Sequence, residues 1–375
     1  MRGPPTGSGA RCSGWERPTA RPATSRRPSV ADGCSAGIFL THQRHPDKDP
    51  REALDEQLTL VRATRDLGYD SVFAGQHHLA ESFAHIQPLP WLARLAAEAG
   101  DMRVGIGIHL LALHNPVDTA ENYAGLDIVC GGRLIFGVGL GYRDLEYDAF
   151  GIGREGRVHR FEENLRIVEA LWAGEEVHAD LPWCRLDGVR ATMRPVGKPP
   201  IWMAANSDKA VRRAARLSDT WMINPHATAA TVRRQLELFG SEREVAGRGP
   251  VTELPLMREI FCAPTREKAV ELARPHLANK YSVYADWGQD KVMPDKESFR
   301  AAYDELSNDR FVIGTPDDCL EALLPWRELG VDHFLFRTDW AGMPVADALS
   351  SIELLAKEVV PALRRSAQGA SAKGN

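Results

Sequence analysis

Short apolar runs alternate with amphipathic segments along most of the chain. From Ala36 onward the runs contain β-branched residues, which is typical of buried parallel strands. The segments between them carry apolar residues at helical spacing, as at Leu54, Leu58 and Val61. The runs that predict strands cover residues 36–40, 70–75, 102–110, 134–139, 200–205, 220–224, 254–262 and 332–337. Strands alternating with helices over about 330 residues predict an α/β fold, a (β/α)8 TIM barrel with insertions.

A doubly wound sheet is the alternative fold, and one glycine-rich strand end argues against it. Residues 137–141 read GVGLG, which is GxGxG rather than the GxGxxG of a dinucleotide-binding turn. This segment opens into Tyr142, Arg143 and Asp144 and not directly into a helix. The barrel is therefore the better prediction.

Local signals predict where helices begin and where the barrel carries insertions. Asp49, Asn115 and Thr315 each precede a proline, a pattern typical of a helix N-cap followed by the first helical residue. Residues 175–198 are interrupted by prolines and glycines and predict an inserted hairpin or loop. Residues 281–310 form a polar segment longer than most loops, which predicts a mobile cover over the barrel mouth.

The two ends of the chain differ in composition from its body. Residues 1–35 are rich in Arg, Pro, Gly and Ser and lack the apolar segment of a secretory signal, so we expect a disordered N-terminal extension. Residues 36–366 are expected to form the barrel domain, and residues 367–375 a disordered tail.

Composition and charge narrow the class of protein. The 375 residues are 43% hydrophobic and 26% charged, which is typical of a soluble globular protein. A formal net charge of -5 without a basic stripe gives no sign of nucleic-acid binding, and no apolar run approaches the length of a membrane span. Six cysteines without a CxxC pair predict free thiols in a reducing, cytoplasmic location.

Polar residues follow several of the predicted strands, where a parallel barrel carries its active site. Gln76, His77 and His78 follow the second strand, and adjacent imidazoles are candidates for proton transfer near neutral pH. The expected mouth carries no lysine, which argues against Schiff-base chemistry. Its histidines show no metal-ligand spacing, so no metal site is expected.

A second strand end predicts a place for a phosphate. Ala205, Asn206 and Ser207 lead from a strand straight into a helix, whose first N–H groups and Ser207 hydroxyl suit an anion. An ordinary N-cap is the alternative reading of the same residues. Gly107 and Gly139 leave open space at neighbouring strand ends, so a planar cofactor that bears a phosphate becomes the better explanation.

The order and spacing of four segments resemble those of the bacterial luciferase-like flavin oxidoreductases. They cover residues 68–78, 104–142, 201–221 and 310–318, and the resemblance extends from about Ala36 to the end of the barrel. It implies the same barrel and a bound FMN, used as reduced FMN, or in some branches a deazaflavin coenzyme.

The resemblance also implies roles for particular residues. His77 matches the histidine that many members place near the flavin, and Gly107–Ile108 matches a non-prolyl cis peptide under the flavin ring. Tyr142 is expected at the edge of the flavin or of the substrate, with simple loop packing as the alternative. The expected cofactor-binding residues are Gly107, Ile108, Leu110, Gly139, Tyr142, Ala205, Asn206 and Ser207. Gln76 departs from the glutamate of many members, which removes a charge beside His77.

The favoured function is a monooxygenase that uses reduced FMN and dioxygen to oxidise a small organic substrate. A separate NAD(P)H-dependent flavin reductase is the expected partner, and a homodimer is expected. The runner-up is a deazaflavin-dependent hydride-transfer enzyme on the same barrel. Related deazaflavin sugar-phosphate dehydrogenases tend to carry acidic residues at the places of Gln76 and Tyr142, which this chain lacks. A flavin-binding protein without turnover and a metal hydrolase are the remaining alternatives.

Overall fold

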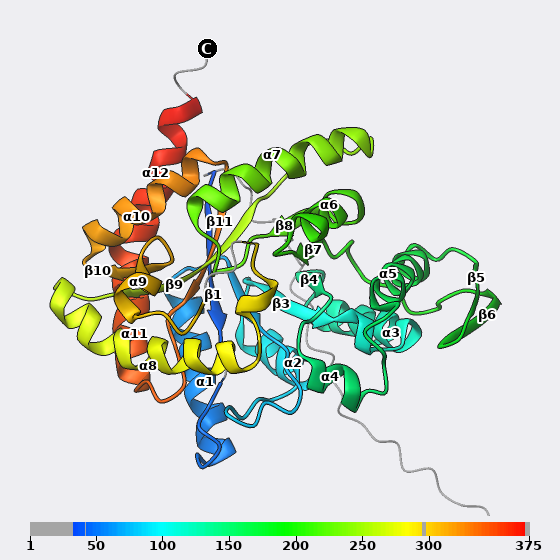
Figure 1. Cartoon of the computed structure of the whole chain (residues 1–375), viewed down its shortest axis with the longest axis horizontal. Helices are drawn as coiled ribbons and strands as arrows, with labels where there is room; N and C mark the ends of the chain where they lie inside the picture. Colours follow the sequence, from blue (N-terminus) through cyan, green and yellow to red (C-terminus); the bar gives the residue numbers. More distant parts are fainter. Residues whose placement is uncertain (1–32, 42, 295–297, 372–375) are drawn as a thin grey trace, which may run out of the picture.

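The computed structural model describes residues 33–41, 43–294 and 298–371 (Figure 1). Most of the N-terminal extension and the last residues of the tail lie outside these ranges. The last helix ends at Ser371, so the tail predicted from residue 367 begins inside a helix. Within the described ranges, no helix is both long and apolar enough to cross a membrane.

A curled sheet of nine parallel strands organises the molecule. Its strands are β1 (Ser35–Leu40), β2 (Ser71–Ala74), β3 (Arg103–Leu110), β4 (Leu134–Gly139), β7 (Ile201–Ala204), β8 (Thr220–Met222), β9 (Pro255–Cys262), β10 (Phe311–Gly314) and β11 (His333–Arg337). They pair in the order β10-β9-β11-β1-β2-β3-β4-β7-β8. All the predicted strands are present. The prediction missed β10, because its four residues follow directly on a segment that reads as polar loop.

Helices follow most of the strands and cover the outside of the sheet (Figure 1). They are α1 (Pro50–Asp66), α2 (Pro88–Glu98), α3 (Pro116–Val129), α4 (Asp144–Ala149), α5 (Arg157–Ala173), α6 (Asp208–Leu217), α7 (Ala229–Val245), α8 (Arg266–Asp286), α9 (Tyr303–Ser307), α10 (Pro316–Glu328), α11 (Val345–Leu354) and α12 (Val360–Ser371). The three predicted N-caps are confirmed: the side chains of Asp49, Asn115 and Thr315 each accept a backbone N–H of the following helix.

One predicted insertion is confirmed and the other is partly wrong. The antiparallel hairpin of β5 (Val177–Leu181) and β6 (Cys184–Val189) lies at the right edge of Figure 1, far from β1. The predicted cover over residues 281–310 instead begins inside α8. Tyr281 and Tyr284 continue the buried face of that helix, because they follow Leu277 at helical spacing.

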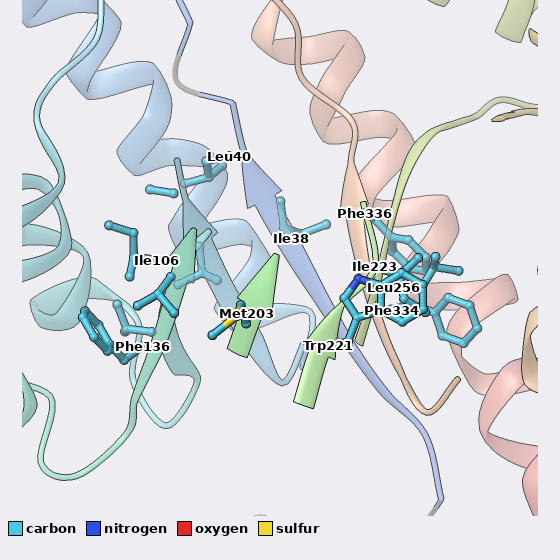
Figure 2. Close-up of a cluster of buried hydrophobic side chains, with 14 of the residues drawn as sticks. Ile38, Leu40, Ile106, Phe136, Met203, Trp221, Ile223, Leu256, Phe334 and Phe336 are labelled. Carbon is cyan, nitrogen blue, oxygen red and sulfur yellow. The ribbon is translucent and has the colours of Figure 1, made fainter. Parts of the chain in front are cut away.

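Side chains along the strands alternate between two apolar clusters. The outer cluster also contains the buried residues of the helices, and Figure 2 labels Ile38, Ile106, Phe136 and Met203 among its strand members. The buried members of the inner cluster come from strands alone: Phe39, Phe73, Ile135, Trp202, Met222, Met257 and Leu335. Both faces of the strands are therefore buried, which explains why the strands read as continuous apolar runs.

The inner cluster shows how strongly the sheet curls. Phe73 of β2 stacks on Trp202 of β7 at a centroid distance of 5.3 Å, although two strands lie between them in the sheet. Just beyond the end of β8, the Ile223 N–H donates to the Pro255 carbonyl and the Met257 N–H donates to the Ile223 carbonyl, both at 3.0 Å. One end of the sheet, β8, thus reaches β9, which is the strand next to the other end.

Close packing between β3 and β4 generates the first prediction. A Cβ atom at Gly137 would lie 1.9 Å from the Ile106 carbonyl oxygen, which is backbone and cannot move aside cheaply. Gly137→Ala should therefore destabilise the protein by about 3 kcal/mol or more, measured as a lower denaturant midpoint.

Gly240→Ala is the matched control, because Gly240 lies within α7 and a Cβ there would meet nothing within 4 Å. Better helix propensity should leave that variant as stable as the parent, or more stable by up to about 1 kcal/mol. Equal midpoints for the two variants would contradict the packing.

Candidate functional site

The inward positions at the carboxyl ends of the strands fall into two contrasting groups. Side chains point inward at every second residue, so the next inward positions lie two residues beyond the inner cluster. On β2, β3, β4 and β7 these positions hold the small residues Gly75, Gly107, Gly137 and Ala204. We call this the small half of the mouth. On β9 and β11 the corresponding positions are Glu259 and Arg337, which pair in register, and we call them the charged half. One side of the mouth therefore presents mainly backbone, and the other carries charge.

The small half contains the predicted cis peptide, which is confirmed at Gly107–Ile108. A Cβ atom at Gly107 would lie 2.7 Å from the Phe39 ring, so the backbone packs closely against that ring. Leu110 is buried, and its N–H donates to Gln76 Oε1 at 2.8 Å. Gln76 thus accepts this hydrogen bond with a neutral amide.

His77 is held by a carboxylate that the sequence reasoning had not assigned to it. His77 Nδ1 lies 3.2 Å from Glu146 Oε1 of α4, and the same oxygen accepts the His78 N–H at 2.8 Å. The Glu146 side chain is only 1% exposed. Burial alone would raise the pKa of Glu146, but the hydrogen bonds and positive charges of His77, His78 and Arg143 hold it below its usual value. An ionised Glu146 fixes Nδ1, so a proton exchanged with a ligand would pass through Nε2.

Two expectations about charge at the mouth are therefore wrong. A carboxylate does stand beside His77, although it is separated from it by 69 positions in sequence. A lysine is also present: Lys280 of α8 is buried and donates to Glu259. Sequence reasoning missed both, because each comes from a helix that follows the strand and not from a strand end. The spacing of Arg143 and Glu146 on one helical face was the available signal.

Aromatic rings form a wall beside His77. The ring of Trp287, directly after α8, lies 5.0 Å from that of His77 and stacks on Tyr284 at 5.4 Å. The Tyr142 ring meets His77 edge-on at 5.9 Å, and the Arg143 guanidinium lies 4.3 Å from the Trp287 ring centre. The first part of the predicted cover thus belongs to α8, whose end places Trp287 against His77.

The turn after β7 has the geometry of the start of a helix. Ala205 is buried and its carbonyl accepts the Trp221 Nε1–H at 3.0 Å, while the Asn206 carbonyl accepts from Gln235 at 2.8 Å. Ser207 is exposed and is the N-cap of α6. These contacts fix the turn and leave its N-cap residue open to solvent.

One feature near this turn opposes anion binding, and the structure compensates for it. Asp208 is the first residue of α6, but Arg234 binds its carboxylate at 2.7 and 2.9 Å. The Ser207 hydroxyl accepts the Ala210 N–H at 3.4 Å, which is a long hydrogen bond. The helix N-terminus therefore keeps its preference for an anion.

A group of histidines behind Gln76 has a structural role. His109 is buried, stacks on His114 at 4.3 Å and lies 3.1 Å from the Tyr123 hydroxyl through Nδ1. Burial and the nearby charge of His78 lower the pKa of His114 to about 4, and burial lowers that of His109 well below its usual value. Both rings are therefore neutral at pH 7 and pack as part of the core.

A curled parallel sheet with an imidazole–carboxylate pair and an open helix N-terminus at its carboxyl edge is the layout of an α/β enzyme. The chain belongs to the luciferase-like monooxygenase family, whose sequence profile matches residues 35–333. Members of this family are flavin-dependent monooxygenases and oxidoreductases, and this chain is an enzyme of that kind.

Relatives in the family use two kinds of cofactor. The oxygenase component of the flavin-dependent trigonelline monooxygenase of Acinetobacter baylyi is 25% identical over 348 residues, covering 88% of this chain and 95% of the relative. The F420-dependent glucose-6-phosphate dehydrogenase of Beutenbergia cavernae is 27% identical over 315 residues, covering 79% and 90%. The oxygenating constituent of 3,6-diketocamphane monooxygenase from Pseudomonas putida, solved with FMN, superposes with a TM-score of 0.74 at 18% identity, covering 88% and 98%.

The His77–Glu146 pair generates the second prediction. Glu146→Gln keeps the shape of the side chain but removes the charge that orients His77. Turnover should fall about tenfold to a hundredfold, and its pH dependence should change, while flavin binding is unchanged.

Asp148→Asn is the control, because Asp148 lies on the same short helix and is exposed. That variant should keep both the rate and the pH dependence of the parent. If Glu146→Gln also kept them, His77 would not depend on its carboxylate.

Proposed function

We propose that this protein is a monooxygenase that uses reduced FMN and dioxygen to oxidise a small organic substrate. A separate NAD(P)H-dependent reductase would supply the reduced flavin. Residues 36–366 would form the catalytic domain, a (β/α)8 barrel closed by β8 against β9, with β10 as an added strand. The Ile223 hydrogen bonds to β9 support this closure. A cytoplasmic homodimer is the expected state.

The residues at the mouth fit FMN. The small half offers backbone at Gly107 and Ile108 on which a flat ring can rest, with Leu110 and Gly139 beside it. Ala205, Asn206 and Ser207 would hold the phosphate at the start of α6. Bound reduced flavin supplies the electrons that activate dioxygen.

The chain's own side chains would control protons and water around the flavin. His77, oriented by Glu146, would hold or pass a proton at Nε2. The rings of Tyr142 and Trp287 beside it would exclude water from the reacting atoms. No other group is needed to orient His77, because Glu146 is already buried and ionised.

The observation that favours FMN over a deazaflavin is how the nearby cations are engaged. The deazaflavin coenzyme carries an acidic tail, which calls for accessible basic residues. Arg143 is buried, donates to the carbonyls of His78 and Leu79, and pairs with Glu146. Arg154 pairs with Asp144. Cations that are already paired at this edge suit a single phosphate better than an acidic tail.

A deazaflavin-dependent hydride-transfer enzyme is the second candidate, and one observation favours it. Hydride abstraction from an alcohol needs a proton acceptor, and the His77–Glu146 pair supplies one. The F420-dependent relative supports this candidate, as the oxygenase component supports the first. The affinity of the chain for each cofactor therefore has to be measured.

The third prediction distinguishes the two candidates by titrating each cofactor into the full chain without oxygen. Reduced FMN should bind in the micromolar range, about -8 kcal/mol, and more tightly than reduced F420. Admitting dioxygen should then return the flavin to its oxidised absorbance while it stays bound. If the chain held F420 more tightly than reduced FMN, the monooxygenase proposal would be wrong.

A further inference from the structure

The charged half holds two cations on one carboxylate, away from solvent. Arg337 Nη1 lies 3.3 Å from Glu259 Oε1, and Lys280 Nζ donates to the same oxygen. The other carboxylate oxygen accepts the Trp340 Nε1–H at 2.7 Å. Arg337 is 5% exposed, and Lys280 and Glu259 are less exposed still. With Lys280 protonated, these three ionisable side chains carry one more positive than negative charge, and burial makes unbalanced charge costly.

The pKa values of two neighbouring groups, His226 and Lys280, are lowered by burial and by positive charge. His226 lies close by, with its ring 5.9 Å from that of Tyr284. Burial lowers the pKa of His226 well below its usual value, and the charges of Arg337 and Lys280 lower it further. Burial and the charge of Arg337 also lower the pKa of Lys280 to about 7. An anion at this position would reduce the repulsion between Arg337 and Lys280, which Glu259 and Asp339 only partly offset.

Among the hydrogen-bond donors at the mouth that lack a partner within the described residues, two belong to Arg337 and Tyr142. Arg337 Nε and the Tyr142 hydroxyl are buried and have no hydrogen-bond partner among the described residues. Buried polar atoms in folded proteins are nearly always paired, so each such atom calls for an explanation. Arg337 is itself held in place, since its Nη2 donates to the Tyr284 hydroxyl at 3.2 Å. A guanidinium that is fixed in place and has an unused N–H can donate a hydrogen bond to a bound ligand.

Aromatic contacts join this cluster to the small half. The Arg337 guanidinium lies 5.2 Å from the centre of the Phe39 ring, and the same ring lies under Gly107. Tyr284 stacks on Trp287, which contacts His77, and Tyr142 contacts His77 as well. A ligand bound to Arg337 and Tyr142 would therefore lie among flat rings and next to the site proposed for the flavin.

We propose that the charged half binds the carboxylate of a planar organic acid, and that this acid is the substrate class of the enzyme. Arg337 Nε and the Tyr142 hydroxyl donate to the carboxylate oxygens, and its charge balances the excess of Arg337 and Lys280 over Glu259. The surrounding rings contact the flat body of the acid. That the acid is a substrate rests on the proposed function. Its binding does not, because it can be measured without any flavin.

The test compares benzoate with benzamide, which share their ring and differ in charge. Each is titrated into the flavin-free full chain, and binding is followed by calorimetry and by tryptophan fluorescence. Benzoate should bind at least about tenfold more tightly than benzamide, the scale of one hydrogen bond to a charged group. Equal affinities, or no benzoate binding at millimolar concentration, would overturn the proposal.

Tyr142→Phe identifies the site without disturbing the fold, because it removes an oxygen that has no partner among the described residues. Benzoate affinity should fall about tenfold while benzamide affinity stays the same, and the ligand-free variant should unfold at an equal or higher denaturant midpoint. Tyr303→Phe is the control, since the Tyr303 hydroxyl of α9 is likewise buried and unpaired within the described ranges. Unchanged benzoate binding by Tyr142→Phe would overturn the proposal.

The outcome is separable from the fate of the proposed function. Benzoate binding that depends on Tyr142 supports the anion site even if the chain prefers F420 to FMN. Tight binding of reduced FMN without any preference for benzoate over benzamide would leave the monooxygenase proposal intact and remove this one.

Discussion

Close packing inside the curled sheet is the constraint on which the rest of the structure depends. The inner cluster fills the space between the strands with large side chains such as Phe73 and Trp202. Above it, β3 and β4 approach so closely that Gly137 has room for no side chain, and Gly107 rests on the Phe39 ring. The same packing that closes the interior therefore leaves a flat area of backbone at the carboxyl edge. In the proposed function, the planar cofactor would rest on this backbone.

Charge is distributed around that flat area in a definite way. Glu146 orients His77 on one side, and Glu259 holds Arg337 and Lys280 on the other. Each carboxylate is buried and stays ionised because hydrogen-bond donors and cations surround it. The start of α6 supplies a third polar region. The places proposed for a proton, a phosphate and an organic anion thus lie in three electrostatically distinct regions around this backbone.

Local sequence signals predicted much of this, and contacts between distant residues explain what they missed. The strands were predictable because both of their faces are apolar, and the caps because Asp49, Asn115 and Thr315 act within their own helix. The cis peptide at Gly107–Ile108 followed from the family resemblance and is confirmed. The Glu146 partner of His77 could not be derived, because it depends on how a helix after β4 packs against the end of β2. The extent of α8 was misjudged because its buried tyrosines stand among polar residues.

The central claim is that the small half and the start of α6 together bind FMN, and the affinity of Ser207→Asp for FMN tests it most directly. Aspartate is as good an N-cap as serine, so α6 should persist while a negative charge faces the phosphate. Thr228→Asp makes the same change at the N-cap of α7 and serves as the control. The account predicts that Ser207→Asp weakens FMN binding at least about tenfold and that Thr228→Asp does not. Equal affinities for the two variants would contradict it and would require the phosphate to bind elsewhere.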